Sequence, residues 1–157
     1  MSSVVYYLDT SALIKRYVAE TGSRWIQETV DPQSGNLLLT SRLSIVEARS
    51  ALARRRREAS IDADDHAYLV GVFNDHCHAQ YHLVEVEGDV VDKACDLLDK
   101  HSLRAYDAVQ LASAVVMNAS LIASGLPGLV FLCSDERLLA AAEAEGLKWH
   151  NPSNMDV

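Results

Sequence analysis

Short apolar runs that alternate with helical segments are the feature that most restricts the fold of this chain. The runs are rich in β-branched and aromatic residues, as buried strands are, and turn-forming or capping residues bound them. Strands separated by helices form a parallel sheet with helices on both faces. The sequence therefore predicts an α/β fold, a three-layer α/β/α sandwich around a central parallel sheet of four or five strands, with the first strand central. The predicted strands cover residues 4–8, 37–40, 81–86, 129–133 and, at one edge, 147–150.

The length of 157 residues fits a single domain that can bury a core without disulfides. We expect residues 1–150 to form this domain and residues 151–157 to be a loose C-terminal tail. No apolar run approaches the length of a membrane span and no signal peptide is visible, so we expect no membrane association. The three cysteines are widely spaced, which indicates reduced thiols in a cytoplasmic protein.

The net charge of −8 argues against a general nucleic-acid coat, because such proteins are basic. It leaves open an enzyme that meets nucleic acid through a local basic patch and a metal ion. A zinc site at His76, Cys77, His78 and His82 is not favoured, because no second ligand pair follows at the usual spacing.

Four acidic residues lie where the surrounding sequence would not place a carboxylate for packing alone. Asp9 and Asp135 each follow an apolar strand and precede a helix, so neighbouring strands would bring both to one crevice. Glu47 is in line with core-facing residues of its helix. Asp107 is near the start of a helix that is apolar on nearly every side, where an unpaired carboxylate is costly.

Each acid also has an ordinary structural interpretation. Asp9 and Asp135 could simply cap the helices that follow them. Glu47 could form a capping box with Ser44, although the helix is expected to begin earlier, at residue 40 or 41. Asp107 could be stabilised by the helix N-terminus or by the arginine three residues before it.

Taken together, the four acids favour a site for one or two divalent cations. Mg²⁺ and Mn²⁺ are hard cations that prefer oxygen ligands and keep several waters. Without a cation, converging carboxylates would repel each other and some would take up protons. The hydroxyl groups of Thr10, Ser11 and Ser134 could supply further oxygen ligands or hold the acids in place.

Four segments occur in a fixed order over about residues 4 to 150: YLDTSALIKRY, SIVEARSAL, LRAYDAVQLASA and SDERLLAAAEAEGL. In this order they resemble the four motifs of the PIN-domain nucleases, and most closely the VapC-type toxins of type II toxin–antitoxin pairs. The resemblance implies a PIN-like α/β/α fold and a metal-dependent endoribonuclease that leaves a 5′-phosphate and a 3′-hydroxyl. It also implies an RNA substrate, a small antitoxin that occludes the site, and a homodimer.

Carried over position by position, the resemblance makes Asp9, Glu47, Asp107 and Asp135 the catalytic acidic quartet. Asp9 and Asp107 would be the principal ligands of Mg²⁺ or Mn²⁺. Glu47 and Asp135 would complete the site through waters or a second ion.

Basic residues near the predicted crevice are candidates for RNA contacts. The run Arg54–Arg57 does not form one basic face, because four consecutive helix residues point in four directions. A solvated helix C-terminus explains this run as well as RNA binding does. The remaining candidates are Arg104, Arg137, Lys15, Arg16 and Arg42, of which we favour the first two.

Two other functions stay open from the sequence. A phosphatase of the haloacid-dehalogenase type also begins with an aspartate at a strand end, but it expects a second acid two residues later, where this chain has Ser11. A catalytically silent PIN-like binding module would keep the fold without the chemistry, and the intact quartet argues against it.

Overall fold

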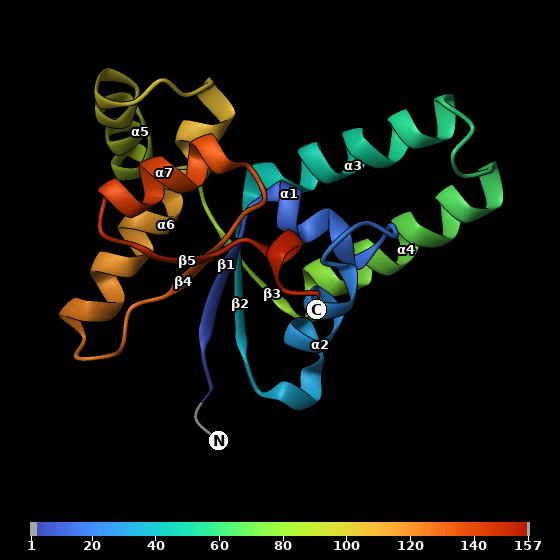
Figure 1. The fold of residues 1–157 in the computed structure, drawn as a ribbon, viewed down its shortest axis with the longest axis horizontal. Helices are drawn as coiled ribbons and strands as arrows, with labels where there is room; N and C mark the ends of the chain where they lie inside the picture. The colour runs from blue at the N-terminus through green and yellow to red at the C-terminus, as the bar shows by residue number, and fades with distance from the viewer. Residues whose placement is uncertain (1–2, 157) are drawn as a thin grey trace.

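A five-stranded parallel sheet runs through the centre of the protein in the order β3-β2-β1-β4-β5 (Figure 1). The computed structural model describes residues 3–156. Each strand pairs in parallel with its neighbours, and β1 lies between β2 and β4. The prediction of an α/β sandwich with a central first strand is therefore confirmed. The strands are β1 (Val5–Leu8), β2 (Leu37–Ser41), β3 (Tyr81–Val84), β4 (Val130–Leu132) and β5 (Lys148–His150).

Helices cover both faces of this sheet, as parallel strands require. In Figure 1, α5, α6 and α7 lie on one side of the strands and α1 to α4 on the other. The helices are α1 (Thr10–Leu13), α2 (Ser23–Val30), α3 (Arg42–Arg57), α4 (Ala63–Ala79), α5 (Gly88–Lys100), α6 (Ala105–Ala123) and α7 (Glu136–Ala144), with short 3₁₀ helices η1 (Ile14–Arg16), η2 (Pro32–Ser34) and η3 (Pro152–Asn154).

Alternating side chains of β1 connect the two halves of the core. Tyr7 is fully buried among residues of α5, α6 and α7, and its ring stacks on Phe131 with 5.6 Å between the ring centroids. Leu8 is fully buried on the opposite face, in the cluster beneath α1 to α4. Each such side chain contributes roughly 1.5–3 kcal/mol by leaving water. The first strand is thus anchored on both faces, which fixes the position of Asp9 directly after it.

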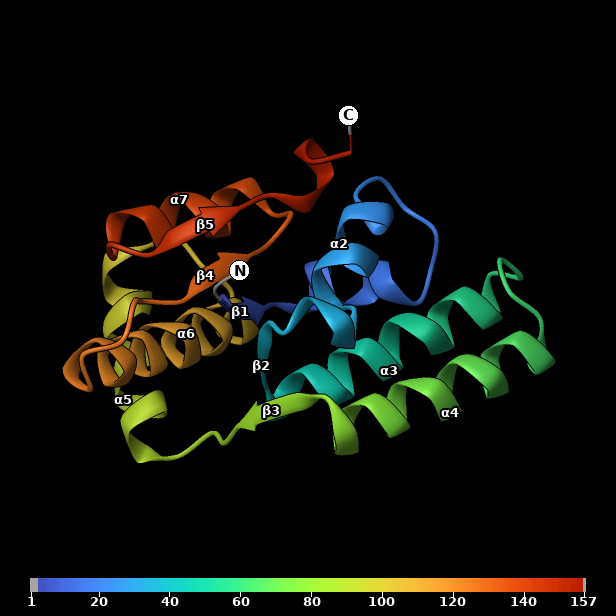
Figure 2. The same ribbon diagram turned by 90° about the horizontal axis from the view of Figure 1, so that it is seen from below.

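The boundaries of α3 and α4 follow from their caps. The Ser41 hydroxyl accepts a hydrogen bond from the backbone nitrogen of Leu43 at 3.1 Å, so α3 begins there and Glu47 is not part of a capping box. At α4, Asp62 and Asp65 form the reciprocal capping box. Both helices extend as an antiparallel pair beyond the rest of the protein (Figure 2).

The C-terminal residues 151–156 are packed against the domain, so the expectation of a loose tail is wrong for them. The Asp156 carboxylate accepts hydrogen bonds from the backbone nitrogens of Gly22 (2.7 Å) and Trp25 (3.0 Å), at the start of α2. Gly22 has φ of 94°, and a Cβ there would lie 2.6 Å from the carbonyl oxygen of Pro152. Only glycine therefore allows this close approach. Val157 of the expected tail lies outside the described residues.

Helix α6 corrects the statement that no apolar segment approaches the length of a membrane span. Over Ala105–Ala123 it is long and apolar enough to pass a length and composition test for a membrane span. It packs against α5 and the sheet, and residues such as Leu111 and Ala112 are fully buried in the core. Core helices pass the same test, so the helix is weak evidence for a membrane span.

Candidate active site

All four predicted acids lie at one edge of the sheet, where β1, β2 and β4 end. Asp9 follows β1, Asp135 follows β4, Glu47 is in the second turn of α3 after β2, and Asp107 is in the first turn of α6. A cleft of about 570 Å³ opens at this edge. We call it the acid cleft, and it is lined by Glu47, Arg104, Tyr106, Asp107, Asp135, Glu136 and Arg137.

Asp9 is buried and has two roles. Its Oδ1 accepts hydrogen bonds from the Ser11 hydroxyl at 2.7 Å and from the backbone nitrogen of Ala12 at 3.0 Å, so it caps α1. Only 5% of the residue is exposed. Burial raises the pKa of Asp9 to about 6, and the neighbouring charge of Asp107 adds to the increase. Capping uses one carboxylate oxygen and does not remove the cost of burying the charge.

The carboxylate of Asp107 interacts electrostatically with each of the other three acids. Burial raises its pKa first, and the carboxylates of Asp135 and Glu47 raise it further, while Arg104 and Arg137 lower it. Asp107 also contributes to the raised pKa of Asp9. Among residues 3–156, no ion pair joins Asp107 to an arginine. The alternative that Asp107 is simply paired with Arg104 is therefore not supported.

Glu47 is fixed by a residue that the sequence analysis missed. Gln110 is 2% exposed, and its Nε2 donates to Glu47 Oε1 at 2.9 Å, Ser44 Oγ at 2.9 Å and Thr10 Oγ1 at 3.2 Å. Its Oε1 accepts a hydrogen bond from the Tyr7 hydroxyl at 2.7 Å. Gln110 thus connects the core of the sheet to the acid cleft. The sequence did contain a signal for Gln110, because it is a polar residue one turn after Asp107 on the otherwise apolar helix α6.

Asp135 caps α7, as its ordinary interpretation predicted. Its Oδ1 accepts hydrogen bonds from the backbone nitrogens of Arg137 at 2.9 Å and Leu138 at 3.3 Å. The residue is exposed and also lines the acid cleft. Capping and a place in the cleft are therefore compatible for Asp135, whereas Asp9 is buried and does not line the cleft.

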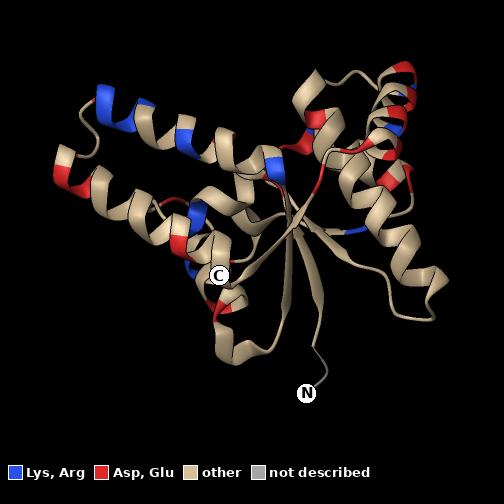
Figure 3. Cartoon of the chain, turned by 180° about the vertical axis from the view of Figure 1, so that it is seen from behind, with Lys and Arg blue, Asp and Glu red and all other residues tan. Residues whose placement is uncertain are grey.

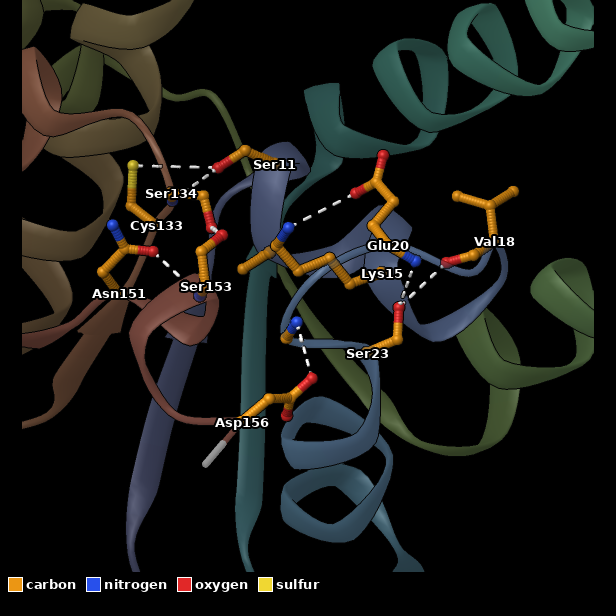
Figure 4. A network of polar contacts seen from close by, with 12 residues as sticks. Ser11, Lys15, Val18, Glu20, Ser23, Cys133, Ser134, Asn151, Ser153 and Asp156 are labelled. Atoms are coloured by element: carbon orange, nitrogen blue, oxygen red, sulfur yellow. Dashed lines mark hydrogen bonds and ion pairs between the residues drawn. The ribbon is translucent and has the colours of Figure 1, made fainter.

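Ser11 connects the two strand ends (Figure 4). Its hydroxyl donates to Asp9 Oδ1 at 2.7 Å and accepts from the backbone nitrogen of Ser134 at 2.9 Å. The Ser134 hydroxyl instead contacts Ser153 Oγ at 3.2 Å, in the direction of the tail. Cys133, a second missed residue, is fully buried between the acids, and burial raises the pKa of its thiol, which stays neutral. Of the three hydroxyls proposed to support the acids, that of Ser11 contacts Asp9 and that of Thr10 contacts Gln110, whereas the Ser134 hydroxyl points to the tail.

Comparison with known proteins identifies the family. The PIN domain model matches residues 6–125. The chain belongs to the PIN domain family. Ribonuclease VapC45 and ribonuclease VapC49, from two strains of Mycobacterium tuberculosis, are each 35% identical over 142 residues, which cover 90% of this chain and 92% of either relative.

Solved structures of other proteins share the fold of this PIN domain. VapBC2 from Rickettsia felis, bound to a DNA fragment from its promoter, aligns with a TM-score of 0.64 at 10% identity, over 94% of this chain and 98% of that one. PAE2754 from Pyrobaculum aerophilum aligns with a TM-score of 0.60 at 22% identity, over 93% and 83%. At these identities the likeness concerns the fold alone.

The donor set of this PIN domain fits a hard divalent cation. Within residues 3–156, no three His, Cys, Asp or Glu side chains converge closely enough to form a ready cage. Mg²⁺ does not need one, because it keeps several waters and is often held by one or two carboxylates. Burial raises the pKa values of Asp9 and Asp107, so ionising both costs free energy that a bound cation would offset. Asp9 and Asp107 would therefore be suitable ligands for Mg²⁺ or Mn²⁺.

Two of the five basic residues proposed to contact RNA line the acid cleft. Arg104 directly precedes α6, which carries Asp107, and Arg137 is in the first turn of α7, two residues after Asp135. Both lower the pKa of Asp107, so their positive charges reach into the cleft. They are well placed to bind the phosphates of a substrate.

The other three basic candidates are paired elsewhere and do not line the acid cleft. Lys15 is buried and pairs with Glu20 at 3.4 Å. Arg16 donates to the Tyr81 hydroxyl at 2.9 Å, on the far side of η1. Arg42 pairs with Glu85. The expectation that these three residues would lie at the crevice is therefore not met, because local partners hold them.

Proposed function

We propose that this chain is a divalent-cation-dependent endoribonuclease, the toxin of a type II toxin–antitoxin pair. Relatives named ribonucleases are 35% identical to it over 90% of its length. The single structural observation that carries the proposal is Asp107, a half-buried acid coupled to Asp9, Glu47 and Asp135 in a cleft with two arginines. Coupled, poorly neutralised carboxylates of this kind mark functional sites more often than structural ones.

In this proposal each side chain has a defined task. Asp9 and Asp107 hold the cation, while Glu47 and Asp135 complete the site through waters or a second ion. When bound, Mg²⁺ or Mn²⁺ would polarise a phosphate oxygen and lower the pKa of a water that attacks the phosphodiester. Gln110 keeps Glu47 turned toward the cleft. The RNA products would carry a 5′-phosphate and a 3′-hydroxyl.

Arg104 and Arg137 would bind the phosphates on either side of the bond that is cut. Guanidinium groups bind phosphate oxygens through two parallel hydrogen bonds, which positions the backbone as well as attracting it. The cleft itself has more acids than arginines, so bound cations would have to neutralise the carboxylates before the two arginines could hold RNA. Part of the net charge of −8 lies away from the cleft. α5, for example, carries Asp89, Asp92, Asp96 and Asp99.

The partners and location belong to the same proposal. The structural relatives include VapBC2 from Rickettsia felis and a toxin–antitoxin complex from Klebsiella pneumoniae. By extension, this chain would have a cognate antitoxin that covers the acid cleft. It would form a homodimer and act in the cytoplasm.

The test is RNA cleavage by the purified protein after removal of metal ions. We expect cleavage of single-stranded RNA only when Mg²⁺ or Mn²⁺ is added back, and a loss of at least about 100-fold in Asp107→Asn, above the usual effect of outer-shell residues. Asp96→Asn, on the exposed face of α5, is the matched control and should cleave normally. Full activity of Asp107→Asn would contradict the proposal.

A second function has one observation in its favour. The absence of a ready three-ligand cage among residues 3–156 would also fit a silent binding module. Titration calorimetry with Mn²⁺ separates the two, because the nuclease binds the ion and Asp107→Asn loses that binding. No heat of binding with the unchanged protein would favour the silent module. Membership of the PIN domain family leaves no support for the phosphatase alternative.

A further inference from the structure

One face of α3 continues from the acid cleft toward the end of the helix. Its residues recur three and four positions apart, the spacing at which side chains lie on one helix face. We call this face the α3 stripe, and it consists of Leu43, Val46, Glu47, Ser50, Ala51 and Arg54. The opposite face of α3 is buried in the core through Ser44, Ala48 and Leu52.

The α3 stripe forms one wall of a second hollow, of about 390 Å³. Thr10 and Tyr106 complete the lining, and we call this hollow the side groove. Glu47 and Tyr106 line both the side groove and the acid cleft. If a polymeric ligand lies across the proposed cation site, the neighbouring monomer of that ligand would therefore lie in the side groove. The volume is within the range of about 300–1,000 Å³ that is typical of small-ligand sites.

Two large side chains at the rim of the side groove are exposed to an unusual degree. Tyr106 is 58% exposed and Val46 is 65% exposed. Tyr106 directly precedes Asp107, so the fold places an aromatic ring next to the centre of the acids. Aromatic rings on which unpaired bases stack are the commonest device for binding single-stranded nucleic acid.

Arg54 gives the side groove a positive end. It is exposed, and among residues 3–156 it makes no ion pair, whereas its neighbour Arg55 is held by Glu20 at 2.7 Å. Figure 3 shows basic bands along α3, whereas acidic bands lie on the neighbouring α4 and on α5 at the other side of the protein. Arg54 is therefore free to bind an anionic group such as a phosphate.

We infer that the side groove binds the nucleotide next to the phosphodiester bond that is cut. Its base stacks on Tyr106 against the wall of Val46, and its phosphate pairs with Arg54. This inference rests on the proposed ribonuclease activity. A protein helix fits the groove less well, because the apolar part of the stripe is limited to Leu43, Val46 and the small Ala51. The mixture of an aromatic ring, hydroxyl groups and an arginine fits a nucleotide.

The first experiment measures cleavage of a randomised single-stranded 12-nucleotide RNA pool with Mn²⁺, followed by sequencing of the products. Loss of one stacked base should raise KM about 10-fold in Tyr106→Ala, with kcat nearly unchanged. The base preference at one position beside the cut should become flat. Tyr106→Phe should restore both, and Arg54→Gln should raise KM while retaining the preference. Tyr68→Ala and Arg57→Gln are matched controls, exposed on α4 and at the end of α3.

A second experiment separates this inference from the proposed activity. In the Asp107→Asn background, binding of the same labelled pool is measured by fluorescence anisotropy, where adding Tyr106→Ala should weaken binding about 10-fold. If the unchanged protein cuts no RNA, the proposed function fails while binding still decides the side groove. Unchanged KM, base preference and binding in Tyr106→Ala and Arg54→Gln would overturn the inference. Weaker binding of the cognate antitoxin by these two variants, with RNA binding unchanged, would also overturn the inference, because the groove would then bind a protein.

Discussion

Two clusters of polar side chains lie at opposite ends of the strands, and they differ in how their groups are neutralised. Near the start of β3, the Tyr17 hydroxyl lies 2.5 Å from the Tyr81 hydroxyl and 2.7 Å from His76 Nδ1. Arg16 donates to Tyr81 at 2.9 Å. Each group in this tyrosine cluster has a partner within the protein. In the acid cleft, by contrast, the closest electrostatic neighbours of Asp107 include other acids.

The pKa shifts make the same distinction. In the tyrosine cluster, burial raises the pKa of Tyr17 and, together with Arg16, lowers that of His76, so both stay neutral at physiological pH. Next to the acid cleft, burial raises the pKa of Asp9 to about 6, and above that pH its carboxylate is charged. Both clusters are partly buried, so burial alone does not identify a functional site. A buried carboxylate without a cationic partner is a candidate for one.

The largest predicted difference between the acids and the tyrosine cluster is the pH dependence of cation binding. The pKa of Asp9 is raised from 3.8 when unfolded to about 6 when folded, so its ionisation costs stability as pH rises through this window. The metal-free protein should therefore lose thermal stability between about pH 4 and pH 6, and Mn²⁺ should reverse the loss. Because the ion must displace the proton, its affinity should fall by about tenfold per pH unit below pH 6.

Thermal unfolding and calorimetry over pH 4 to 8, with and without Mn²⁺, measure both effects. Asp9→Asn is the control, because asparagine still caps a helix but cannot ionise. This variant should lose the part of the pH slope that is due to Asp9, together with the Mn²⁺ effect. If the dependence of stability on pH is the same in Asp9→Asn as in the unchanged protein, the pKa of Asp9 is not raised by folding. The electrostatic difference between the acids and the tyrosine cluster would then be wrong.

A smaller effect on cleavage is expected from a substitution of Gln110, which connects the acid cleft to the core. Gln110→Leu removes the donor to Glu47 and the acceptor for the Tyr7 hydroxyl. Cleavage should fall about 10-fold, as for residues that orient metal ligands. The free energy of unfolding should fall by about 1–3 kcal/mol, because a buried hydroxyl loses its partner. Single-turnover cleavage and urea unfolding measure the two losses, and normal cleavage in a destabilised protein would leave Gln110 a structural role only.

The smallest effect on activity belongs to the tyrosine cluster. Tyr17→Phe removes a hydroxyl that contacts Tyr81 and His76, which should cost about 1 kcal/mol of stability. Cleavage should be unchanged, because the cluster lies at the opposite edge from the acids. Phe73→Leu, which alters the same packing without a polar group, controls for the volume change. A specific loss of cleavage in Tyr17→Phe would remove the distinction between a structural and a functional cluster.

Much of the fold could be predicted from the sequence because it depends on local patterns. Apolar runs and capping residues placed the strands and α3, with Ser41 as the cap. The sequence predicted a central first strand but treated the pairing of β1 with β4 only as a condition, which the structure meets. The packing of residues 151–156 could not be predicted, because it depends on Gly22 and Asp156 meeting across the chain. Local sequence carries no signal for such a distant contact.

The candidate site was predicted in part for the same reason. Asp9, Glu47, Asp107 and Asp135 differ from their neighbours in polarity, so each could be recognised alone. Gln110 was missed because its importance depends on four partners from other elements. The basic residues Lys15, Arg16 and Arg42 were placed at the crevice because sequence spacing cannot show which acceptor a flexible side chain reaches.

The packed C-terminus has a practical consequence for anyone who engineers this protein. Ser153 contacts Ser134, whose backbone donates to Ser11 (Figure 4). The Ser11 hydroxyl in turn donates to Asp9. The last turn of the chain is thus three contacts from the proposed cation ligand. A deletion from residue 151 onward removes that connection. Tags are better placed before β1, where the chain approaches the opposite edge of the sheet.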